Sequence, residues 1–224
     1  MQKISAEKKA LIILSGGLDS TVCLYFAREK YTEIETISFD YSQKHKIELQ
    51  KARRIAGQLG VRNTKIKIDT GIFQNSSLVD KSIPVPKKGK VSSGIPNTYV
   101  PGRNLLFLSY AVSFAESRGI GNIFIGVNAL DYSGYPDCRP EFISAFEKTV
   151  ALGTKEGVGG KGIQIHTPLL HLNKKEIVEL GKKLKVPFGK THSCYDPIDG
   201  KPCGKCESCV LRKKGFAEAG ILDE

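Results

Sequence analysis

Short apolar runs alternate along the chain with stretches whose apolar residues recur at helical spacing. The runs that predict strands are Ala10–Leu14, Ile34–Phe39, Thr64–Ile68, Asn122–Val127 and Gly162–His166. Each is bounded by polar or glycine-containing segments, as strands usually are. Strands that alternate with helices are typical of an α/β protein with a largely parallel sheet.

The stretches between these runs predict the helices. They are Thr21–Ala27, His45–Leu59, Asn104–Glu116, Glu141–Leu152 and Lys174–Leu184. Their apolar residues recur three and four positions apart, so that each helix would bury one face. Asn173, followed three residues later by Glu176, predicts a capping box at the start of the last helix.

Two segments interrupt this alternation. Gly71–Thr98 contains three prolines and predicts a long irregular insertion, which we interpret as a lid because loops of that length in compact domains are usually functional or mobile. Gly157–Gly162 fits the spacing G-x-G-x-x-G, but it follows a predicted helix and precedes a predicted strand. That order is the reverse of a dinucleotide-binding turn, so we expect only a flexible connector.

Length and composition limit the kind of protein. At 224 residues and 40% hydrophobic content, the chain can bury one sizeable core, with room for a small appendage. It has no apolar run long enough to span a membrane, and Met1–Lys9 lacks a signal peptide's apolar stretch, so we expect a cytoplasmic protein with no membrane association. The net charge of +11 suits nucleic acid or polyphosphate ligands and does not choose between them.

The strongest local motif is Ser-Gly-Gly-Leu-Asp-Ser at residues 15–20, directly after the first predicted strand and before a predicted helix. Gly16 and Gly17 allow a sharp turn close to a ligand, and the amides at the helix start favour an anion. A Walker loop ending in Gly-Lys-Ser/Thr is absent from the sequence. The motif therefore predicts a different kind of pyrophosphate cradle.

The side chains of this loop suit the same ligand. Ser15, Ser20 and Thr21 offer hydroxyl donors. Asp19 is an acid in an anion site, and we interpret it as an indirect holder of magnesium or as a helix cap.

Four of the six cysteines form the pattern C-x8-C-x2-C-x2-C at Cys194, Cys203, Cys206 and Cys209. Intracellular thiols are kept reduced, so such clustering predicts metal binding before disulfides. Four thiolates fill the coordination shell of one tetrahedral zinc ion, which would then be structural. An iron–sulfur cluster is the alternative. His192 could compete as a ligand, although we interpret it as a polar loop residue.

The other two cysteines lie outside this cluster. Cys23 falls in the helix after the phosphate loop and is interpreted as a small core residue. Cys138 falls in a polar loop rich in Asp and Tyr, where a nucleophilic thiol is conceivable.

Taken together, several motifs in order resemble the 7-cyano-7-deazaguanine synthase family of the PP-loop ATP pyrophosphatase superfamily. They are residues 15–20, Tyr41–His45, Tyr99–Asn104, Asp131–Arg139, His166–Leu169 and the four cysteines. The resemblance implies a Rossmann-like, adenine nucleotide alpha hydrolase-like fold, with a mostly parallel sheet and helices on both faces. It also implies a catalytic domain over residues 1–189 and, over residues 190–224, a zinc-binding segment with a C-terminal helix.

The resemblance further implies a chemistry. Members adenylate the carboxylate of 7-carboxy-7-deazaguanine with ATP and Mg2+, convert it with ammonia to the amide, and activate the amide again to give the nitrile for queuosine biosynthesis. Such an enzyme is a C–N-forming ligase, usually a homodimer, and would carry one structural Zn2+ per chain.

The resemblance also implies roles for individual residues. The nucleotide-binding residues would be Leu14, Ser15, Gly16, Gly17, Leu18, Asp19, Ser20, Thr21, Val22, Cys23 and Leu24. The substrate-binding residues would be Tyr41, Gln43, Arg103, Asn104, Asp131, Tyr132, Tyr135, Asp137 and Arg139. The catalytic residues would be Asp19, Ser20, His45 and Arg103.

The proposed roles follow from the chemistry of these side chains. Tyr132 or Tyr135 could stack on the deazaguanine ring while Asp131 or Asp137 accepts its N–H groups. His45 could deprotonate ammonium or the amide. Lys44, Arg103 and Arg139, with Mg2+, could balance charge on the phosphates.

Two other functions fit parts of the pattern. A PP-loop tRNA-modifying enzyme, a thiolase or a lysidine-type ligase, would use the same adenylation, and the positive charge favours it. The sulfur-carrying cysteine of such a thiolase would have to be Cys138. The sequence shows no additional RNA-binding domain, so we expect no nucleic-acid partner. A non-catalytic zinc protein that binds nucleic acid through its basic C-terminal third would leave the phosphate loop without a use.

Overall fold

A five-stranded parallel sheet forms the centre of the computed structural model, which describes residues 8–69, 73–87, 94–130 and 134–223. Its strands are β1 (Lys9–Ile13), β2 (Glu33–Asp40), β3 (Arg62–Lys67), β4 (Asn122–Ile125) and β5 (Gln164–His166). They lie in the order β3-β2-β1-β4-β5, and every neighbouring pair is parallel. The five predicted strands are therefore confirmed.

The sheet is covered by the predicted helices, with the C-terminal helix and one short additional helix. They are α1 (Leu18–Arg28), α2 (Ile47–Gln58), α3 (Arg103–Ser117), α4 (Pro140–Gly153), α5 (Lys155–Val158), α6 (Lys174–Lys183) and α7 (Glu207–Ala219). The capping box of α6 is present, because Asn173 accepts from the Glu176 amide at 3.0 Å and Glu176 accepts from the Asn173 amide at 2.7 Å. The interpretation of Gly157–Gly162 as a connector needs one correction. Gly157 and Val158 are the last two residues of α5, and Thr154 caps the start of that helix.

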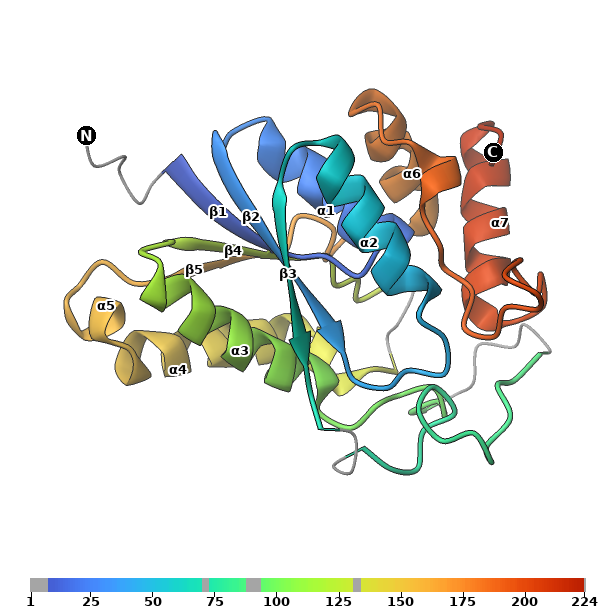
Figure 1. Ribbon diagram of the computed structural model, residues 1–224, viewed down its shortest axis with the longest axis horizontal. Coiled ribbons are helices and arrows are strands. Elements are labelled where there is room, and N and C mark those ends of the chain that lie inside the picture. The colour runs from blue at the N-terminus through green and yellow to red at the C-terminus, as the bar shows by residue number, and fades with distance from the viewer. Residues whose placement is uncertain (1–7, 70–72, 88–93, 131–133, 224) are drawn as a thin grey trace.

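The helices lie on both faces of the sheet (Figure 1). Along β1 and just beyond it, Ala10, Ile12 and Leu14 pack in one apolar cluster with α1, α2, α6 and α7, whereas Leu11 and Ile13 pack in the other with α3 and α4. Because successive side chains of a strand point to opposite faces, one short run supplies both clusters. The doubly covered α/β architecture expected from the sequence is confirmed.

The order of the strands decides where a ligand can enter. The chain winds outward from β1 through β2 to β3, then returns to β4 on the other side of β1. In open parallel sheets the crevice at such a switch point, beyond the carboxyl ends of the strands, is where ligands bind. The phosphate loop follows β1 and therefore lies at that crevice.

β4 ends two residues earlier than predicted, at Ile125, because the chain meets the phosphate loop there. A Cβ on Gly126 would lie 3.0 Å from the carbonyl carbon of Asp19 and 3.0 Å from the Ser20 amide nitrogen. The backbone of α1 can approach so closely only because residue 126 has no side chain.

The segment 190–223 shares the apolar interior of the rest of the described chain. Cys194 and Cys206 belong to one cluster and Phe216 of α7 to the other, and α7 packs along α6. The described parts of the long insertion, 73–87 and 94–98, form neither helix nor strand. No helix in the described part of the chain has the length and apolar character needed to cross a membrane.

Candidate functional site

The phosphate loop is held by its own serines. The hydroxyls of Ser15 and Ser20 lie 2.9 Å apart, and the Ser15 amide donates to the Ser20 hydroxyl at 3.2 Å. The Gly17 amide donates to the Ser15 hydroxyl, also at 3.2 Å. The turn is therefore already shaped at the start of α1, where amides favour an anion.

Gly16 is required by its surroundings as well as by the turn. Its φ is +88°, and a Cβ would lie 2.3 Å from the carbonyl oxygen of Glu48 and 2.6 Å from the Ala52 amide nitrogen in α2. Any side chain would collide with this backbone. Gly16 thus allows α2 to pack directly onto the loop.

Residues 21–24, the later part of the predicted nucleotide-binding segment, support the phosphate loop from the interior of the protein. Thr21 donates its hydroxyl to the Gly17 carbonyl at 2.7 Å. Val22, Cys23 and Leu24 are fully buried in the apolar cluster. Cys23 is the core residue expected, and burial raises the pKa of its thiol.

Asp19 does not cap α1, because the N-cap residue is Gly17 and no side chain caps it. The Asp19 carboxylate instead pairs with the ammonium of Lys174, whose Nζ lies 2.8 Å and 2.9 Å from the two carboxylate oxygens. The helix-cap interpretation of Asp19 is therefore wrong, and a role toward a cation remains.

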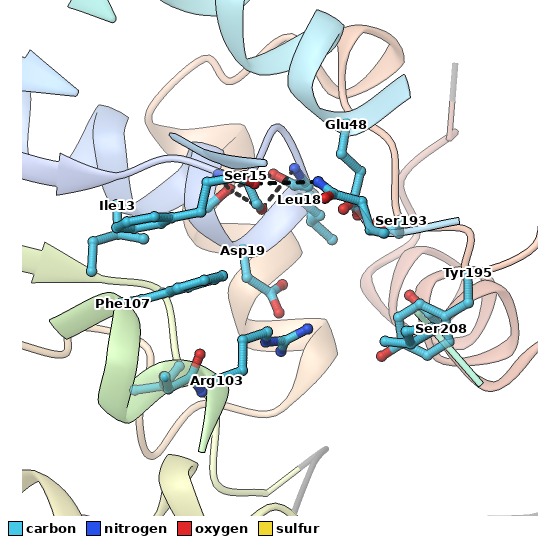
Figure 2. A pocket seen from close by; sticks show the side chains of 18 of the residues that line it. Ile13, Ser15, Leu18, Asp19, Glu48, Arg103, Phe107, Ser193, Tyr195 and Ser208 are labelled. Atoms are coloured by element: carbon cyan, nitrogen blue, oxygen red, sulfur yellow. Dashed lines mark hydrogen bonds between the residues drawn. The ribbon is translucent and has the colours of Figure 1, made fainter. Parts of the chain in front are cut away.

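A cleft with a cavity volume of about 210 Å³ opens beside this loop. The predicted site residues that line it are Leu14, Ser15, Gly17, Leu18, Asp19, Ser20, Tyr41, Gln43, His45, Arg103, Asn104 and Tyr135. They come from the segment after β1, from α1, from the segment after β2, from the start of α3 and from the loop before α4. Figure 2 shows Phe107 and Arg103 on one side and Glu48, Ser193, Tyr195 and Ser208 on the other.

Arg103 is the principal cation on its side of the cleft. Its Nη1 donates to the Tyr41 hydroxyl at 3.3 Å, and its guanidinium lies 5.9 Å from the centre of that ring. Burial alone would lower the pKa of Arg103, but the oxygens of Tyr41, Tyr135 and Asp137 outweigh burial and raise it. Arg103 therefore remains charged and presents a fixed positive group to the cleft.

Asp137 holds the backbone next to Arg103. Its carboxylate accepts from the Asn104 amide at 2.8 Å, at the first turn of α3. Asn104 in turn donates through Nδ2 to the sulfur of Cys138 at 3.2 Å. Asp137 is thus placed behind the cleft wall and not among its lining residues.

Cys138 is buried, and this burial raises the pKa of its thiol to about 12, with Asp137 adding to the shift. A thiol with so high a pKa is a poor nucleophile at neutral pH. The nucleophilic interpretation of Cys138 therefore loses its support.

Gln43 and His45 shape the wall that follows β2. Gln43 accepts from the Tyr41 amide at 3.0 Å and donates to the Phe39 carbonyl at 3.3 Å, so it fixes the strand end. The His45 ring packs edge-on against His192, with centroids 5.4 Å apart. Burial lowers the pKa of His45, opposed by a backbone hydrogen bond at Cys194. A neutral imidazole at this position can accept a proton.

Arg139 falls elsewhere. It is exposed at the N-cap of α4 and does not line the cleft. Asp131 and Tyr132 lie outside the residues that the structure describes. Tyr135, by contrast, is buried at the cleft, and its hydroxyl lies 2.7 Å from that of Thr98.

The cleft also contains residues that the motifs did not single out. They are Glu48, Lys174, Ser193, Tyr195, Ser208 and Arg212. The last four come from the C-terminal segment, so this segment forms a wall of the cleft. The only sequence signal for these four was proximity to the cysteine pattern; Lys174 lay beside the predicted capping box, and Glu48 had no such signal.

Glu48 is the most unusual of these. It lies in the first turn of α2, and burial raises the pKa of its carboxyl to about 7, although the Arg103 guanidinium opposes the shift. A carboxyl that titrates near neutral pH inside a cleft is a candidate for proton transfer.

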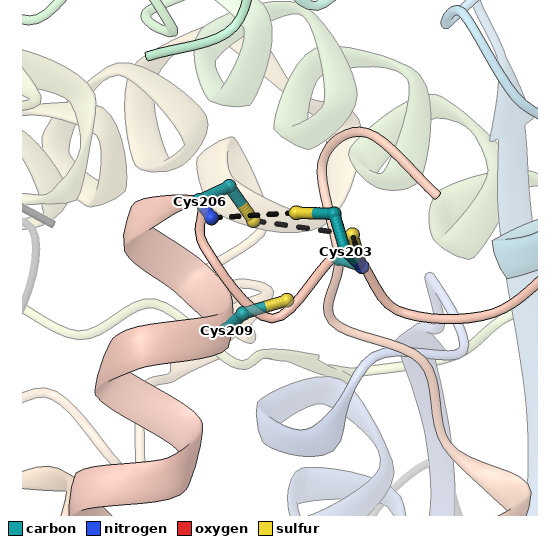
Figure 3. A group of neighbouring side chains, drawn as sticks. Cys203, Cys206 and Cys209 are labelled. Carbon is teal, nitrogen blue, oxygen red and sulfur yellow. Dashed lines mark hydrogen bonds between the residues drawn. The ribbon is translucent and has the colours of Figure 1, made fainter. Parts of the chain in front are cut away.

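The four cysteines meet near the start of α7. Figure 3 labels three of them, Cys203, Cys206 and Cys209. The four Sγ atoms all lie within 4.8 Å of one another, and those of Cys194 and Cys206 are 3.9 Å apart. Four sulfurs at ~2.3 Å from one zinc ion form a tetrahedron with edges of about 3.8 Å. The spacing therefore fits one shared ion.

Backbone amides support these sulfurs. Cys194 accepts from the amides of Cys203 at 3.2 Å and Asp196 at 3.4 Å, and Cys203 accepts from the Cys206 amide at 3.3 Å. Amide donors of this kind favour thiolates, which are the form that binds metal. The cluster can therefore bind a metal ion.

The doubly covered parallel sheet and the Ser-Gly-Gly-Leu-Asp-Ser turn at its switch point define a PP-loop enzyme of the ATP-using class. The family profile described as "Queuosine biosynthesis protein QueC" matches residues 9–220. The chain belongs to this family and is an enzyme of queuosine biosynthesis.

Individual relatives agree with this assignment. The chain is 59% identical to a protein of Leptospira biflexa named 7-cyano-7-deazaguanine synthase, over 99% of this chain and 95% of that protein. It is 50% identical to a protein of the same name from Anaeromyxobacter sp., over 96% and 94%. Among solved structures, it resembles NMN synthetase from Francisella tularensis with a TM-score of 0.50 and 18% identity, over 97% of this chain and 79% of that one. This last likeness concerns the fold alone.

Proposed function

We propose that this chain converts 7-carboxy-7-deazaguanine and ammonia to 7-cyano-7-deazaguanine at the expense of two ATP molecules. The observation that carries the proposal is the position of Arg103 in the same cleft as the phosphate loop. A fixed cation suits a carboxylate substrate, and the loop suits the pyrophosphate that must leave.

The first half-reaction activates the carboxylate. The loop at residues 15–20 binds the β and γ phosphates, so that the α phosphorus faces the substrate. A carboxylate oxygen bonds to that phosphorus as pyrophosphate leaves, which gives an acyl adenylate. Ammonia then displaces AMP, and a proton passes to a base such as His45 or Glu48, leaving the amide.

The second half-reaction repeats the activation on the amide oxygen. Pyrophosphate leaves again, and loss of AMP together with the remaining N–H protons gives the nitrile. Acid and amide differ little in size, so one cleft can accept both. The same cleft is lined by Tyr41, Asn104 and Tyr135, which are proposed to contact the deazaguanine.

Two metals belong to this proposal. Mg2+ would neutralise the phosphates and would be held indirectly by Asp19. Zn2+ would occupy the four cysteines, where no coordination position stays open for chemistry. Its proposed role is to fold the C-terminal wall of the cleft. A homodimeric, cytoplasmic enzyme is proposed on the family resemblance alone.

Product analysis tests the proposal. The protein is incubated with ATP, Mg2+, ammonium and 7-carboxy-7-deazaguanine, and products are followed by mass spectrometry and phosphorus NMR. We expect the nitrile, with two AMP and two pyrophosphate per molecule. ADP and phosphate as direct products would reject the proposed orientation of the nucleotide. Turnover of a tRNA substrate would instead support a tRNA-modifying enzyme.

A further inference from the structure

Glu48 is a partly buried carboxylate in the wall of the cleft. It lies in the first turn of α2 and is one of the residues that line the cleft. In Figure 2 its side chain points from α2 into the cleft, on the side opposite Arg103. No side chain or amide among the described residues donates a hydrogen bond to this carboxylate or forms an ion pair with it. The carboxylate is therefore available to a cation that enters the cleft.

A glutamate in a first helical turn often serves the helix alone. The amides at a helix start favour the charged form of a nearby carboxyl and so lower its pKa. At Glu48 the balance is the opposite, because burial raises the pKa of the carboxyl to about 7. Glu141 is likewise the second residue of its helix, α4, but it is exposed and does not line the cleft. The helix position of Glu48 therefore does not explain why its carboxylate faces the cleft.

The packing of α2 fixes Glu48 beside the phosphate loop. The backbone of Glu48 lies so close to the loop that a Cβ on Gly16 would collide with the Glu48 carbonyl oxygen. An acyl adenylate formed at this loop would therefore lie near the Glu48 side chain. A carboxylate at that place would repel both the phosphates and the substrate carboxylate unless it held a cation.

The wall around Glu48 suits a cation that carries N–H groups. Ser193, Tyr195 and Ser208, which all carry hydroxyls, line the same side of the cleft. The Ser193 hydroxyl accepts from Nη1 of Arg212 at 3.3 Å, so its oxygen is held in the wall. An ammonium group has only N–H donors, and carboxylate and hydroxyl oxygens are the acceptors that it needs.

Magnesium fits this wall less well than ammonium does. It demands a near-ideal octahedral geometry and is usually bound through one or two carboxylates together with substrate phosphates. The charge of the Arg103 guanidinium acts on Glu48 across the cleft, and it would repel a divalent ion more strongly than a monovalent one. A small monovalent cation with N–H donors is therefore the better occupant.

We propose that the Glu48 side of the cleft is the subsite for ammonium. The Glu48 carboxylate binds the ammonium ion, while the Arg103 guanidinium binds the substrate carboxylate from the opposite side. The two reactants are thus brought together from opposite walls. The proposal rests on the proposed function, which makes ammonia a substrate, and adds the place where that substrate binds.

The bound ammonium reacts after one proton transfer. It gives a proton to the Glu48 carboxylate, and the electron pair that this frees on nitrogen forms the bond to the acyl carbon. AMP leaves with the electrons of the acyl–oxygen bond, and the nitrogen releases its second proton to water. A carboxyl whose pKa is raised by burial accepts the proton of ammonium more readily than an ordinary carboxyl does.

Steady-state kinetics of amide formation test the subsite. Ammonium is varied at pH 8 with ATP, Mg2+ and 7-carboxy-7-deazaguanine at saturation, for the parent and for Glu48→Gln. We expect KM for ammonium to rise about tenfold or more, and KM for ATP and for the acid to change by less than about threefold. Glu141→Gln is the matched control and should behave as the parent does. If Glu48→Gln leaves KM for ammonium unchanged, or raises the requirement for Mg2+ instead, the proposal is wrong.

Hydroxylamine separates ammonium binding from a role of Glu48 in shaping the loop. At pH 8 it is largely uncharged, whereas ammonium is largely protonated, and it converts an acyl adenylate to a hydroxamate with release of AMP. Because hydroxylamine needs neither a counter-charge nor a proton acceptor to become nucleophilic, Glu48→Gln should form the hydroxamate at a rate within about threefold of the parent. An equal loss with both nucleophiles would show that Glu48 serves adenylation, and the subsite would be rejected.

Thermal melting tests the subsite without any reaction. Ammonium chloride is compared with sodium chloride at equal concentration and pH 8, in the absence of nucleotide and substrate. At about ten times its dissociation constant, ammonium should raise Tm of the parent by about 3–6 °C relative to sodium, and Glu48→Gln should lose this difference. No difference in the parent, or the same difference in both proteins, would overturn the subsite. A parent that shows the difference but forms no amide would reject only the proposed function.

Discussion

The amide of His192 donates a hydrogen bond of 3.0 Å to the carbonyl oxygen of Gly16. This bond joins the segment that leads into the cysteine cluster to the turn of the phosphate loop. Arg212 of α7 supports the same segment, because its Nη1 lies 2.7 Å from the Thr191 hydroxyl and 3.3 Å from that of Ser193. A backbone hydrogen bond therefore links the segment that carries the four cysteines to the phosphate loop.

The first prediction follows from this connection. Cys206→Ser should abolish binding of the one zinc ion expected per chain and lower the melting temperature by several degrees, because metal binding in such segments contributes folding free energy. The affinity for nucleotide should fall as well. Metal analysis, thermal melting and nucleotide titration measure the three effects. The control Cys23→Ala, in the core but away from the cluster, should retain the metal. Iron in the freshly purified parent would contradict the assignment of the site to zinc.

The second prediction concerns the approach of α2 to the loop. Gly16→Ala should destabilise the protein by about 2–4 kcal/mol and eliminate nucleotide binding, since its Cβ has no room beside Glu48 and its φ is positive. Gly57→Ala is the control on α2, the helix that Gly16 meets, and a Cβ at position 57 meets nothing within 4 Å. That change should stabilise α2 by up to about 1 kcal/mol. Denaturant unfolding of both variants gives the comparison, and equal stability would refute this account of Gly16.

The third prediction is a pH dependence caused by Glu48. Burial raises the pKa of its carboxyl from 4.5 to about 7, so the native protein retains a proton between these pH values that the unfolded chain has released. Stability should therefore fall as pH rises from about 4.5 to about 7, by on the order of 1–3 kcal/mol. Glu48→Gln should remove this loss and be the more stable protein at pH 8. If the stability of parent and Glu48→Gln changes with pH in the same way, the raised pKa of Glu48 is contradicted. Glu147→Gln, exposed on α4, serves as the control.

The fourth prediction concerns the order of chemical steps. With one equivalent of ATP, the amide of 7-carboxy-7-deazaguanine should accumulate, because each loss of oxygen requires its own activation. The isolated amide should then be converted to the nitrile with one further ATP and without ammonium. Quenched samples analysed by mass spectrometry test both statements. If the enzyme does not convert the isolated amide, the proposal that acid and amide bind in the same cleft is wrong.

The sequence by itself determined the fold and the loop. Alternating strand-like and helix-like runs specify which residues are buried on which face, and these periodicities are local properties of the chain. The Ser15–Ser20 turn and the cysteine spacing are likewise short-range, so neighbouring residues alone are enough to indicate their chemistry. Even the capping box at Asn173 required only four consecutive residues.

The tertiary structure decided which distant residues meet. Lys174 follows the first residue of that capping box and resembles an ordinary surface lysine in the sequence, yet the packing of α6 beside α1 places its ammonium on Asp19. Glu48 resembles the exposed acid of a first helical turn, and only the fold encloses it. Ser193, Tyr195 and Ser208 become cleft residues because the C-terminal segment folds back over the loop. Contacts of this kind depend on long-range packing, which no local periodicity encodes.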